Sequence, residues 1–262
     1  KNLPRKEVRR RRRRGRGAQA MMRIDIIGRG NVATHLLRML GAAHDLAQVN
    51  PHTLEGLRPD ADLYLVSVTD NAIREVCGKL RKRLEGEPFV AHTSGTTGIE
   101  ELRECRFRRP GVFYPLQTFS KKVELDYSRI PFFTEADAKN DEALLRRIVE
   151  GLGAKCYYAD SEARRRLHLA SVLSCNFVNH LWHLASGELE KSGLPFGVLM
   201  PLIEETTRKL ADASPYDAQT GPARRGDTVT TSKHLAMLAD DARLAGIYKL
   251  LTDSISKTYE CH

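Results

Sequence analysis

Residues 23–40 predict a strand, a glycine-rich turn and a helix in direct succession. The short apolar run of residues 23–27 is followed by the sequence Gly-Arg-Gly-Asn-Val-Ala at residues 28–33, and apolar residues then recur at helical spacing as far as Gly41. A Gly-x-Gly-x-x-Ala turn between a strand and a helix is typical of the first half of a βαβ unit. This turn constrains the start of the chain to an α/β fold.

Short apolar runs recur along the next part of the chain and are separated by segments with helical or loop patterns. They lie at residues 45–50, 63–68, 88–92, 111–116, 130–134 and 155–158. Such alternation predicts a Rossmann-type doubly wound parallel sheet that is covered by helices.

Beyond residue 160 the strand-like runs stop, and three long amphipathic stretches follow at residues 161–191, 196–213 and 232–257. We therefore expect a dinucleotide-binding domain at residues 21–160 and an all-helical C-terminal domain at residues 161–262. The first stretch is apolar around most of its circumference, which predicts a buried helix.

The net charge of +9 belongs to one end of the chain. Residues 1–17 hold ten Lys and Arg against a single Glu, so residues 18–262 carry equal numbers of acids and bases. Because like charges repel and this stretch has no aromatic side chain for stacking on bases, we expect residues 1–20 to be a disordered basic leader. We expect no nucleic-acid partner.

The composition argues against a membrane protein and against a secreted one. The longest apolar runs, such as residues 63–68, are far too short to cross a bilayer, and no apolar signal-peptide stretch follows the arginines. The five Cys are odd in number, widely spaced and without a Cys-x-x-Cys pair, which argues against a disulfide framework and a zinc site. We expect a cytoplasmic protein without a bound metal.

The glycine turn predicts a dinucleotide site. Gly28 would permit the tight turn, Gly30 would let the backbone approach a pyrophosphate, and Ala33 would allow close packing of helix on strand. The phosphates would lie over the helix N-terminus, where free N–H groups and the helix dipole favour an anion. The alternative is a glycine turn that binds no ligand.

The predicted cofactor is NADP, with NAD as the alternative. An Asp or Glu at the end of the second strand accepts the ribose 2′-hydroxyl of NAD, but residues 49–53 contain no acid, and Arg29 stands between the glycines. An open α/β sheet binds its ligands at the carboxyl ends of the strands. The predicted cofactor-binding residues are Gly28, Arg29, Gly30, Asn31, Val32, Asn50, His52, Val68, Thr69, Thr93 and Ser94.

Histidine and amide side chains follow two further strands and lie along one predicted helix. His92 and Gln117 stand at strand ends, and His168 and Asn176 belong to a polar stripe on the helix that starts near residue 161. A polar stripe on a buried helix must find partners or a ligand. His168 is the first candidate for a catalytic proton donor and His92 the second, while the alternative is a core histidine with satisfied hydrogen bonds.

A loop between two predicted helices concentrates charge. Residues 219–227 hold two arginines, an acid and two glycines, and Arg can grip a carboxylate or phosphate with two parallel hydrogen bonds. Arg225 is therefore a candidate substrate-binding residue, together with Asn176 and Gln117. The alternative is an Arg–Asp pair that only holds the loop.

Together these motifs resemble a known family. They are Gly-Arg-Gly-Asn-Val-Ala-Thr-His-Leu at residues 28–36, His-Thr-Ser-Gly at 92–95, Tyr-Pro-Leu-Gln-Thr-Phe at 114–119, His-Leu-Ala at 168–170, Asn-Phe-Val-Asn-His at 176–180 and Thr-Gly-Pro-Ala-Arg-Arg-Gly-Asp at 220–227. Their order resembles the Rossmann-like proteins whose C-terminal helical half is a domain of unknown function. More distantly, the N-terminal half resembles pyrroline-5-carboxylate reductases and the reductases that pair NADP with a deazaflavin.

The resemblance implies an NADP-linked oxidoreductase that forms homodimers through a helical domain similar to those of 6-phosphogluconate and β-hydroxyacid dehydrogenases. One departure matters for the chemistry. The β-hydroxyacid dehydrogenases carry a catalytic Lys four residues before an Asn, whereas here Val172 stands four residues before Asn176. Lysine-based chemistry therefore does not carry over.

The leading hypothesis is hydride transfer between NADP(H) and a small polar C=O or C=N substrate in a cleft between the domains. Reduction leaves negative charge on oxygen or nitrogen, so a proton donor such as histidine is needed. The rival hypothesis is a dinucleotide-binding sensor or scaffold without turnover, whose helical half recognises a protein partner.

Overall fold

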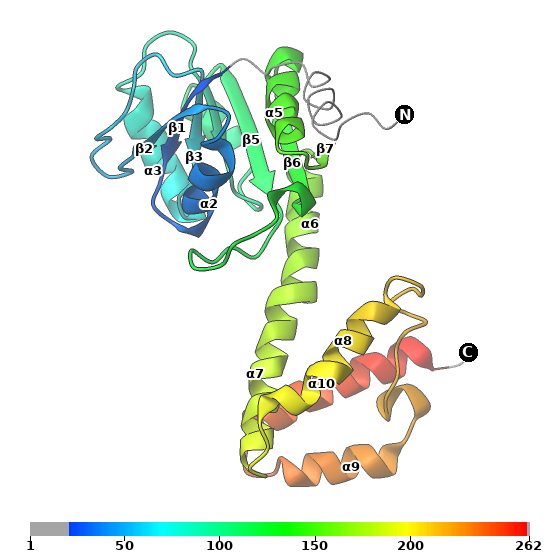
Figure 1. Cartoon of the computed structure of the whole chain (residues 1–262). Helices are drawn as coiled ribbons and strands as arrows, with labels where there is room; N and C mark the ends of the chain where they lie inside the picture. The colour runs from blue at the N-terminus through cyan, green and yellow to red at the C-terminus, as the bar shows by residue number, and fades with distance from the viewer. Residues whose placement is uncertain (1–20, 261–262) are drawn as a thin grey trace, which may run out of the picture. The chain divides into compact units, whose positions relative to one another are not determined.

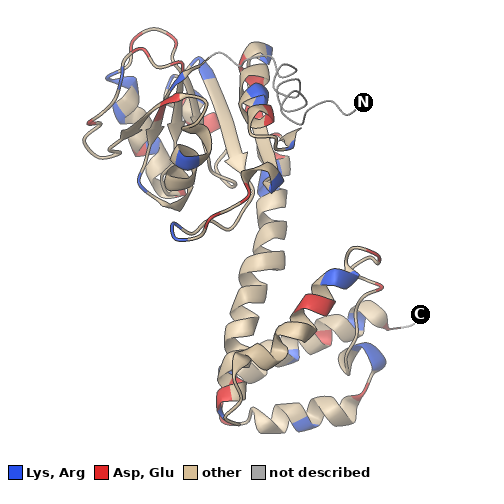
Figure 2. Ribbon diagram, viewed as in Figure 1, with Lys and Arg blue, Asp and Glu red and all other residues tan. Residues whose placement is uncertain are grey.

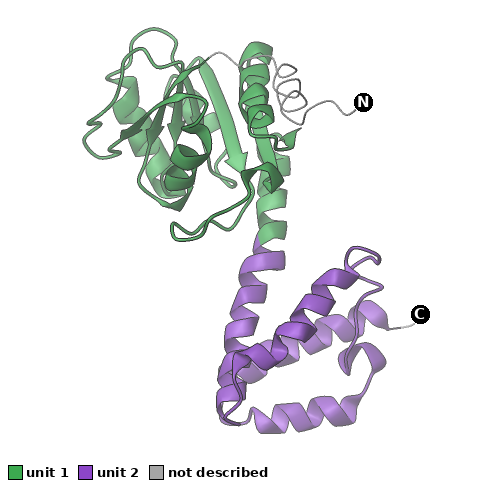
Figure 3. Cartoon of the chain, in the orientation of Figure 1, with its two compact units in different colours: residues 1–171 green, residues 172–262 purple. Residues whose placement is uncertain are grey.

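The computed structural model describes residues 21–260 of the chain. The chain divides into two compact units, residues 1–171 and 172–262 (Figure 3). The boundary between the units lies inside the stretch predicted as one helix over residues 161–191, where an α-helix gives way to a short π-helical segment. The leader predicted for residues 1–20 lies outside the described residues.

A seven-stranded sheet forms the centre of the first unit, in the order β2-β1-β3-β4-β5-β6-β7 (Figure 1). All neighbouring strands are parallel except β5 and β6, which are antiparallel. The strands are β1 (Arg23–Ile27), β2 (Asp45–Val49), β3 (Leu63–Val66), β4 (Phe89–His92), β5 (Arg109–Pro115), β6 (Phe132–Ala136) and β7 (Cys156–Tyr158). The predicted doubly wound, largely parallel sheet is confirmed.

Helices cover both faces of this sheet. One buried apolar cluster holds α2 (Asn31–Leu40) and α5 (Lys139–Gly151) against the strands, and a second cluster holds α3 (Asp70–Arg81) and α4 (Glu100–Glu104). Every residue of β3 and β4 is buried, which explains why these strands are continuous apolar runs rather than alternating ones. The 3-10 turn η1 (Tyr127–Arg129) and the helix α6 (Ser161–Ser171) complete the unit.

The order of the strands reverses at β1. The chain runs from β1 to its neighbour β2 on one side and then crosses to β3 on the other side. In an open α/β sheet such a reversal is where ligands bind, outside the carboxyl ends of the strands. The segments that follow β1, β2, β3 and β4 all start from this edge, because these four strands are parallel.

The second unit is helical, as predicted. Its elements are η2 (Val172–Asn176), α7 (Phe177–Glu190), η3 (Phe196–Leu199), α8 (Met200–Lys209), η4 (Ala223–Arg225), α9 (Thr228–Met237) and α10 (Ala242–Tyr259). The prediction of one helix over residues 232–257 is wrong. The Asp241 carboxylate accepts the N–H of Leu244 at 2.9 Å, and this N-cap starts a new helix inside the periodic stretch.

Apolar side chains of the second unit are mostly exposed within the single chain. Leu184 is the one buried residue among the helices α7 to α10, whereas Phe177, Leu202 and Met237 are exposed. The prediction of a buried helix over residues 161–191 is therefore wrong in the single chain, because the buried residues of α6, η2 and α7 are Ser161, Arg164 and Leu184 alone. Hydrophobic periodicity shows that a face can be buried, but it does not show what covers that face.

Charged side chains of both signs are interspersed over both units (Figure 2). This distribution agrees with the equal numbers of acids and bases in residues 18–262. Among residues 21–260, no helix has the length and apolar character that a membrane span requires.

Candidate dinucleotide-binding site

The turn after β1 requires glycine at position 28. Gly28 has φ +147°, and a Cβ atom added there would lie 2.0 Å from the carbonyl oxygen of Ser67, which follows β3. The N–H of Gly28 donates to the carbonyl of Val49 at 3.2 Å. Because the residue has no side chain, the ends of β1, β2 and β3 come into contact at one point.

The N-terminus of α2 next to this turn is open to an anion. A Cβ atom added at Gly30 would meet nothing within 4 Å, and the neighbouring residues Arg29 and Asn31 are exposed. No side chain of residues 21–260 caps the helix, and its first turn carries no acid. Ala33 is fully buried beside the turn. The free N–H groups and the helix dipole at this N-terminus therefore suit a pyrophosphate.

The turn directly after β2, residues 50–54, carries no acid that would select a ribose hydroxyl. Its tight turn is held by the side-chain oxygen of Asn50, which accepts the N–H of His52 at 2.9 Å, and by the Asn50 carbonyl, which accepts the N–H of Leu54 at 2.9 Å. The side chain of His52 is exposed. The segment begins beside the glycine turn, because Asn50 directly follows Val49, whose carbonyl accepts the N–H of Gly28; the cofactor contacts of Asn50 and His52 stay predictions.

The segments after β3 and β4 lie next along the same edge. Val68 and Thr69 lead into α3, whose N-cap residue is Thr69. Thr93 donates its N–H to the carbonyl of Val66 at 3.1 Å, and the Ser94 hydroxyl oxygen accepts the N–H of Thr97 at 2.9 Å. The topology therefore brings all the residues predicted to bind the cofactor to the carboxyl edge of the four parallel strands.

His92 is bonded within its own loop at both ring nitrogens. Nδ1 accepts the N–H of Ser94 at 3.2 Å, so Nε2 carries the hydrogen that is donated to the carbonyl of Gly98 at 3.3 Å. Burial lowers the pKa of His92 to about 4, and the positive charge of Arg164 acts in the same direction. These contacts favour a neutral histidine that orders the loop, and the catalytic role suggested for His92 stays a prediction.

The buried His92 is expected to make the protein less stable in mild acid. The unfolded chain takes up a proton at His92 near the ordinary pKa of 6.5, whereas the folded chain does so only near pH 4. The contribution of His92 to the free energy of unfolding should therefore be fully present above pH 6.5. It should fall by about 3 kcal/mol as the pH is lowered from 6.5 to 4. Urea unfolding across this range measures the slope. The variant His92→Gln should flatten the slope, and a wild-type slope retained in that variant would contradict the prediction.

Tyr114 and His168 meet beside the loop that follows β4. The Tyr114 hydroxyl lies 3.2 Å from Nδ1 of His168, and a Cβ atom added at Gly95 would lie 2.7 Å from the same nitrogen. Burial raises the pKa of Tyr114. The sequence pattern predicts a site role for His168 but not for Tyr114. The signal that points to Tyr114 is its place near the carboxyl end of a strand.

The three residues predicted to bind a substrate are not brought together by a described contact. Gln117 is exposed in the loop after β5, where its side-chain oxygen accepts the N–H of Thr118 at 2.7 Å. Asn176 and Arg225 belong to the second unit and are exposed there. In the predicted Arg loop, the Asp227 carboxylate caps α9 by accepting the N–H of Thr230 at 3.0 Å. The roles of Gln117, Asn176 and Arg225 stay predictions.

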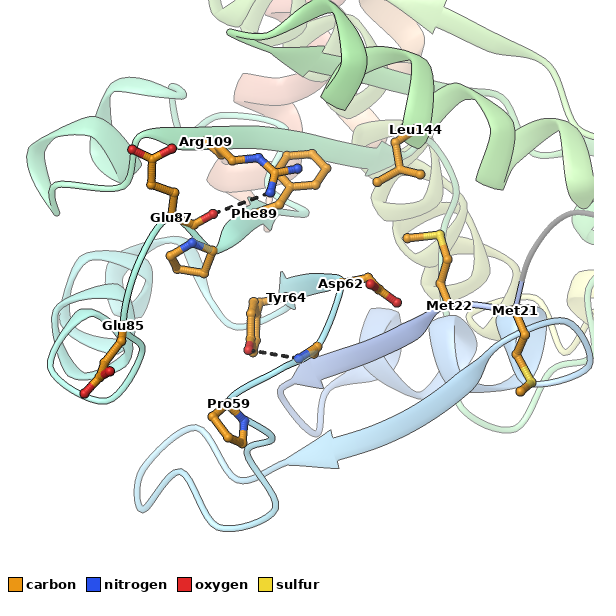
Figure 4. Close-up of a pocket in the computed structure, with 12 residues that line it drawn as sticks. Met21, Met22, Pro59, Asp62, Tyr64, Glu85, Glu87, Phe89, Arg109 and Leu144 are labelled. Atoms are coloured by element: carbon orange, nitrogen blue, oxygen red, sulfur yellow. Dashed lines mark hydrogen bonds between the residues drawn. The ribbon is translucent and has the colours of Figure 1, made fainter.

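The pocket of Figure 4 lies at the opposite edge of the sheet. It has a volume of about 540 Å³ and is lined by residues that precede or begin the strands, among them Met22, Asp62, Pro88 and Arg109. Ligands of open α/β sheets bind at the carboxyl edge, so this pocket is separate from the candidate site. Among residues 21–260, no group of three or more His, Cys, Asp or Glu side chains is placed to hold a metal ion.

Comparisons with known proteins agree with the fold. Residues 130–255 match the family described as Domain of unknown function (DUF2520). A candidate NADP oxidoreductase from Bacteroides fragilis is 38% identical, has a TM-score of 0.83, and the match covers 90% of this chain and 98% of that one. We found no significant match among curated proteins.

Two more distant structures show the same fold alone. A protein from Thermotoga maritima is 18% identical with a TM-score of 0.68, over 90% of this chain and 98% of that one. The pyrroline carboxylate reductase of Plasmodium falciparum, solved with NADP bound, is 11% identical with a TM-score of 0.59, over 91% of this chain and 98% of that one. The chain therefore belongs to the same family as the Bacteroides fragilis protein, and its match to DUF2520 begins at residue 130 inside the Rossmann-like first unit and extends through the helical second unit to residue 255.

Proposed function

We propose that the protein is an NADP-linked oxidoreductase that transfers a hydride to or from the C=O or C=N group of a small polar substrate. The observation that carries the proposal is the turn after β1. Gly28 packs directly against the backbone of Ser67. A Cβ atom at Gly30 would meet no described atom within 4 Å, and the first turn of α2 carries no acid. The description of the Bacteroides fragilis protein as a candidate NADP oxidoreductase supports the same activity.

The residues around the turn suit a 2′-phosphate better than a free ribose hydroxyl. Residues 50–54, directly after β2, contain no carboxylate to accept a hydroxyl or to repel a phosphate. Arg29 and His52 are both exposed beside the turn, and a guanidinium can form parallel hydrogen bonds with phosphate oxygens. NADP is therefore the proposed cofactor, with NAD as the alternative.

The bound cofactor would supply the hydride in a reduction and accept it in an oxidation, and the chain would supply or accept the proton correspondingly. His168 lies half-buried in the first unit with Nδ1 on the Tyr114 hydroxyl. A histidine can donate a proton near neutral pH to the oxygen or nitrogen that receives negative charge in a reduction. We assign His168 this role, and Gln117, Asn176 and Arg225 the binding of the substrate.

The choice of cofactor is tested by comparing the binding of NADPH with that of NADH. We expect the Kd of NADPH to be at least about ten-fold lower than that of NADH, because Arg29 favours the additional phosphate. Isothermal titration calorimetry of both nucleotides measures this ratio. The variant Arg29→Ala should weaken NADPH and leave NADH unchanged, whereas Arg38→Ala, at the other end of α2, serves as the matched control.

Three outcomes of this experiment have different meanings. If neither nucleotide binds, the proposed function is wrong. If NADH binds more tightly, only the choice of cofactor is wrong. If NADPH binds but is not oxidised with a panel of keto acids and cyclic imines, the sensor or scaffold becomes the better hypothesis.

We also propose that the protein is a homodimer formed through the second unit. Leu184 and Leu238 are the buried apolar residues that the described part of this unit contains, and so few buried side chains cannot stabilise helices of this length. Exposed apolar residues such as Phe177, Leu202 and Leu250 are available to a second copy. Light scattering after gel filtration should give twice the mass of the chain, and a monomer at micromolar concentration would contradict the proposal.

A further inference from the structure

We propose that Tyr114 is a positioning residue that acts through His168. In the neutral ring its hydroxyl donates a hydrogen bond to Nδ1 of His168 and thereby leaves the ring hydrogen on Nε2. When the ring takes up a second proton and acts as the acid, Nδ1–H donates to the Tyr114 oxygen, and the proton on Nε2 is the one that is transferred. The contact itself is independent of the activity, but its catalytic meaning rests on the proposed function of His168.

Tyr114 has a hydrogen to donate because its phenol stays protonated. Burial raises the pKa of Tyr114; the nearby Asp70 carboxylate also raises it, while the Arg164 guanidinium partly offsets these effects. The residue lies in β5, which is paired with β4 on one side and β6 on the other. The position of the hydroxyl is therefore fixed by the sheet and does not depend on a flexible loop.

The ring of His168 has one hydrogen-bond partner among the described residues, and that partner is Tyr114. The hydroxyl lies 3.2 Å from Nδ1, and the two ring centroids are 6.3 Å apart. A neutral imidazole carries one donor and one acceptor nitrogen. If Nδ1 were the donor, the partly buried hydroxyl hydrogen would have no acceptor within residues 21–260, which is unfavourable. The arrangement with Nδ1 as the acceptor pairs the Tyr114 hydroxyl hydrogen and leaves the Nε2–H of His168 available to a ligand.

Glycine at position 95 makes room for this contact. A Cβ atom added there would lie 2.7 Å from Nδ1 of His168 and 2.9 Å from the Tyr114 hydroxyl. Both distances are shorter than any ordinary contact of a methyl group, and the neighbouring atoms are those that form the hydrogen bond. The backbone of the loop after β4 is thus packed directly against the tyrosine and histidine.

Arg164 fixes the helix that carries His168. It lies four residues earlier in α6 and therefore on the same face of the helix. Its side chain is fully buried and donates to the Glu135 carboxylate at 2.5 Å and to the Thr97 carbonyl at 2.7 Å. These bonds of Arg164 join α6 to β6 and to the loop that contains Gly95. The helix that carries His168 is therefore held against the sheet and the loop that surround the Tyr114–His168 contact.

Nitrogen-15 NMR of the histidine rings tests the contact without any substrate. At pH 8.5, where an ordinary imidazole is neutral, the wild-type spectrum should show a protonated Nε2 and a hydrogen-bonded, unprotonated Nδ1 for His168. The resonances are assigned by their loss in His168→Gln. In Tyr114→Phe, Nδ1 should shift toward the value of a nitrogen without a hydrogen bond, while the control Tyr158→Phe, at an exposed tyrosine, should leave it unchanged.

A second pair of variants tests the space at the loop. Gly95→Ala should shift the same Nδ1 resonance because the methyl group displaces one of the rings, whereas Gly78→Ala, where a Cβ atom meets nothing within 4 Å, should not. A wild-type Nδ1 that is protonated would overturn the proposal. It would also be overturned if Tyr114→Phe left the His168 resonances unchanged in a folded protein.

A kinetic readout separates positioning from a merely structural role. With any substrate found to be reduced, Tyr114→Phe should lower kcat about ten-fold, which corresponds to the loss of one hydrogen bond, and leave the Kd of NADPH unchanged. His168→Gln should lower kcat further, by about 100-fold or more. Absence of turnover in every variant would contradict the proposed function alone, because the NMR result decides the Tyr114–His168 contact independently.

Discussion

Replacement of Gly28 by Ala is expected to destabilise the first unit and to abolish cofactor binding. The new methyl group would lie 2.0 Å from the carbonyl oxygen of Ser67, and the backbone at φ +147° is one that residues with a Cβ rarely adopt. A backbone atom cannot move away without separating β1 from β3. We expect the free energy of unfolding to fall by about 4 kcal/mol or more.

Replacement of Gly30 by Ala is the informative partner of this variant. A Cβ atom at Gly30 meets no protein atom within 4 Å, and its φ of −75° suits alanine. Stability should therefore change by less than about 0.5 kcal/mol. If the pyrophosphate lies above this residue, the methyl group should nevertheless raise the Kd of NADPH by about 100-fold or more, because it occupies the space of the phosphates.

Urea unfolding and calorimetric titration of NADPH measure the two effects separately. Gly28 is needed for the packing of the turn, and Gly30 is needed for the approach of the phosphates. Gly28→Ala should therefore lower both stability and NADPH affinity, whereas Gly30→Ala should lower the NADPH affinity alone. Normal NADPH binding by Gly30→Ala would show that the turn does not hold a pyrophosphate. Full stability of Gly28→Ala would contradict the packing of the turn against Ser67.

The contrast between these glycines and Tyr114 shows what the sequence could reveal. The glycine turn was predictable because its spacing, strand and helix lie within 18 consecutive residues. His168 was predictable as a polar residue on a largely apolar helix. Its contact with Tyr114 joins residues 54 positions apart, and the need for glycine at position 95 exists only because these two rings lie against it. No local pattern contains that information.

His92 and Arg164 illustrate a different limit. A histidine at a strand end suggested proton transfer, but the bonds from Ser94 and to Gly98 that make it neutral depend on the path of the loop. Arg164 is followed in the sequence by Arg165 and Arg166, and three consecutive arginines suggest a solvated surface. In the fold, Arg164 is fully buried and Arg166 is exposed, because adjacent residues of a helix point about 100° apart.

Replacement of Arg164 by Met is expected to be among the most destabilising single changes in the first unit. The guanidinium faces the Glu135 carboxylate, which is 7% exposed, and also donates to the carbonyl of Thr97. Methionine fills a similar volume but leaves a buried carboxylate without its cation. The loss of one partner from such a pair costs about 3–5 kcal/mol.

Two further variants distinguish the loss of charge from the loss of packing. Arg166→Met changes the same residue type on the same helix, but its ion pair with Glu162 is exposed, so the effect on urea unfolding should be below about 1 kcal/mol. The double variant Arg164→Met with Glu135→Gln removes the isolated carboxylate and should regain part of the stability. If Arg164→Met were as mild as Arg166→Met, the buried Arg164 side chain would not be what joins α6 to β6 and to the loop after β4. The fixed position assigned to His168 would then need another cause, because that loop and the start of α6 are connected chiefly through Arg164 and the bond from the Ile99 N–H to the Ser161 hydroxyl.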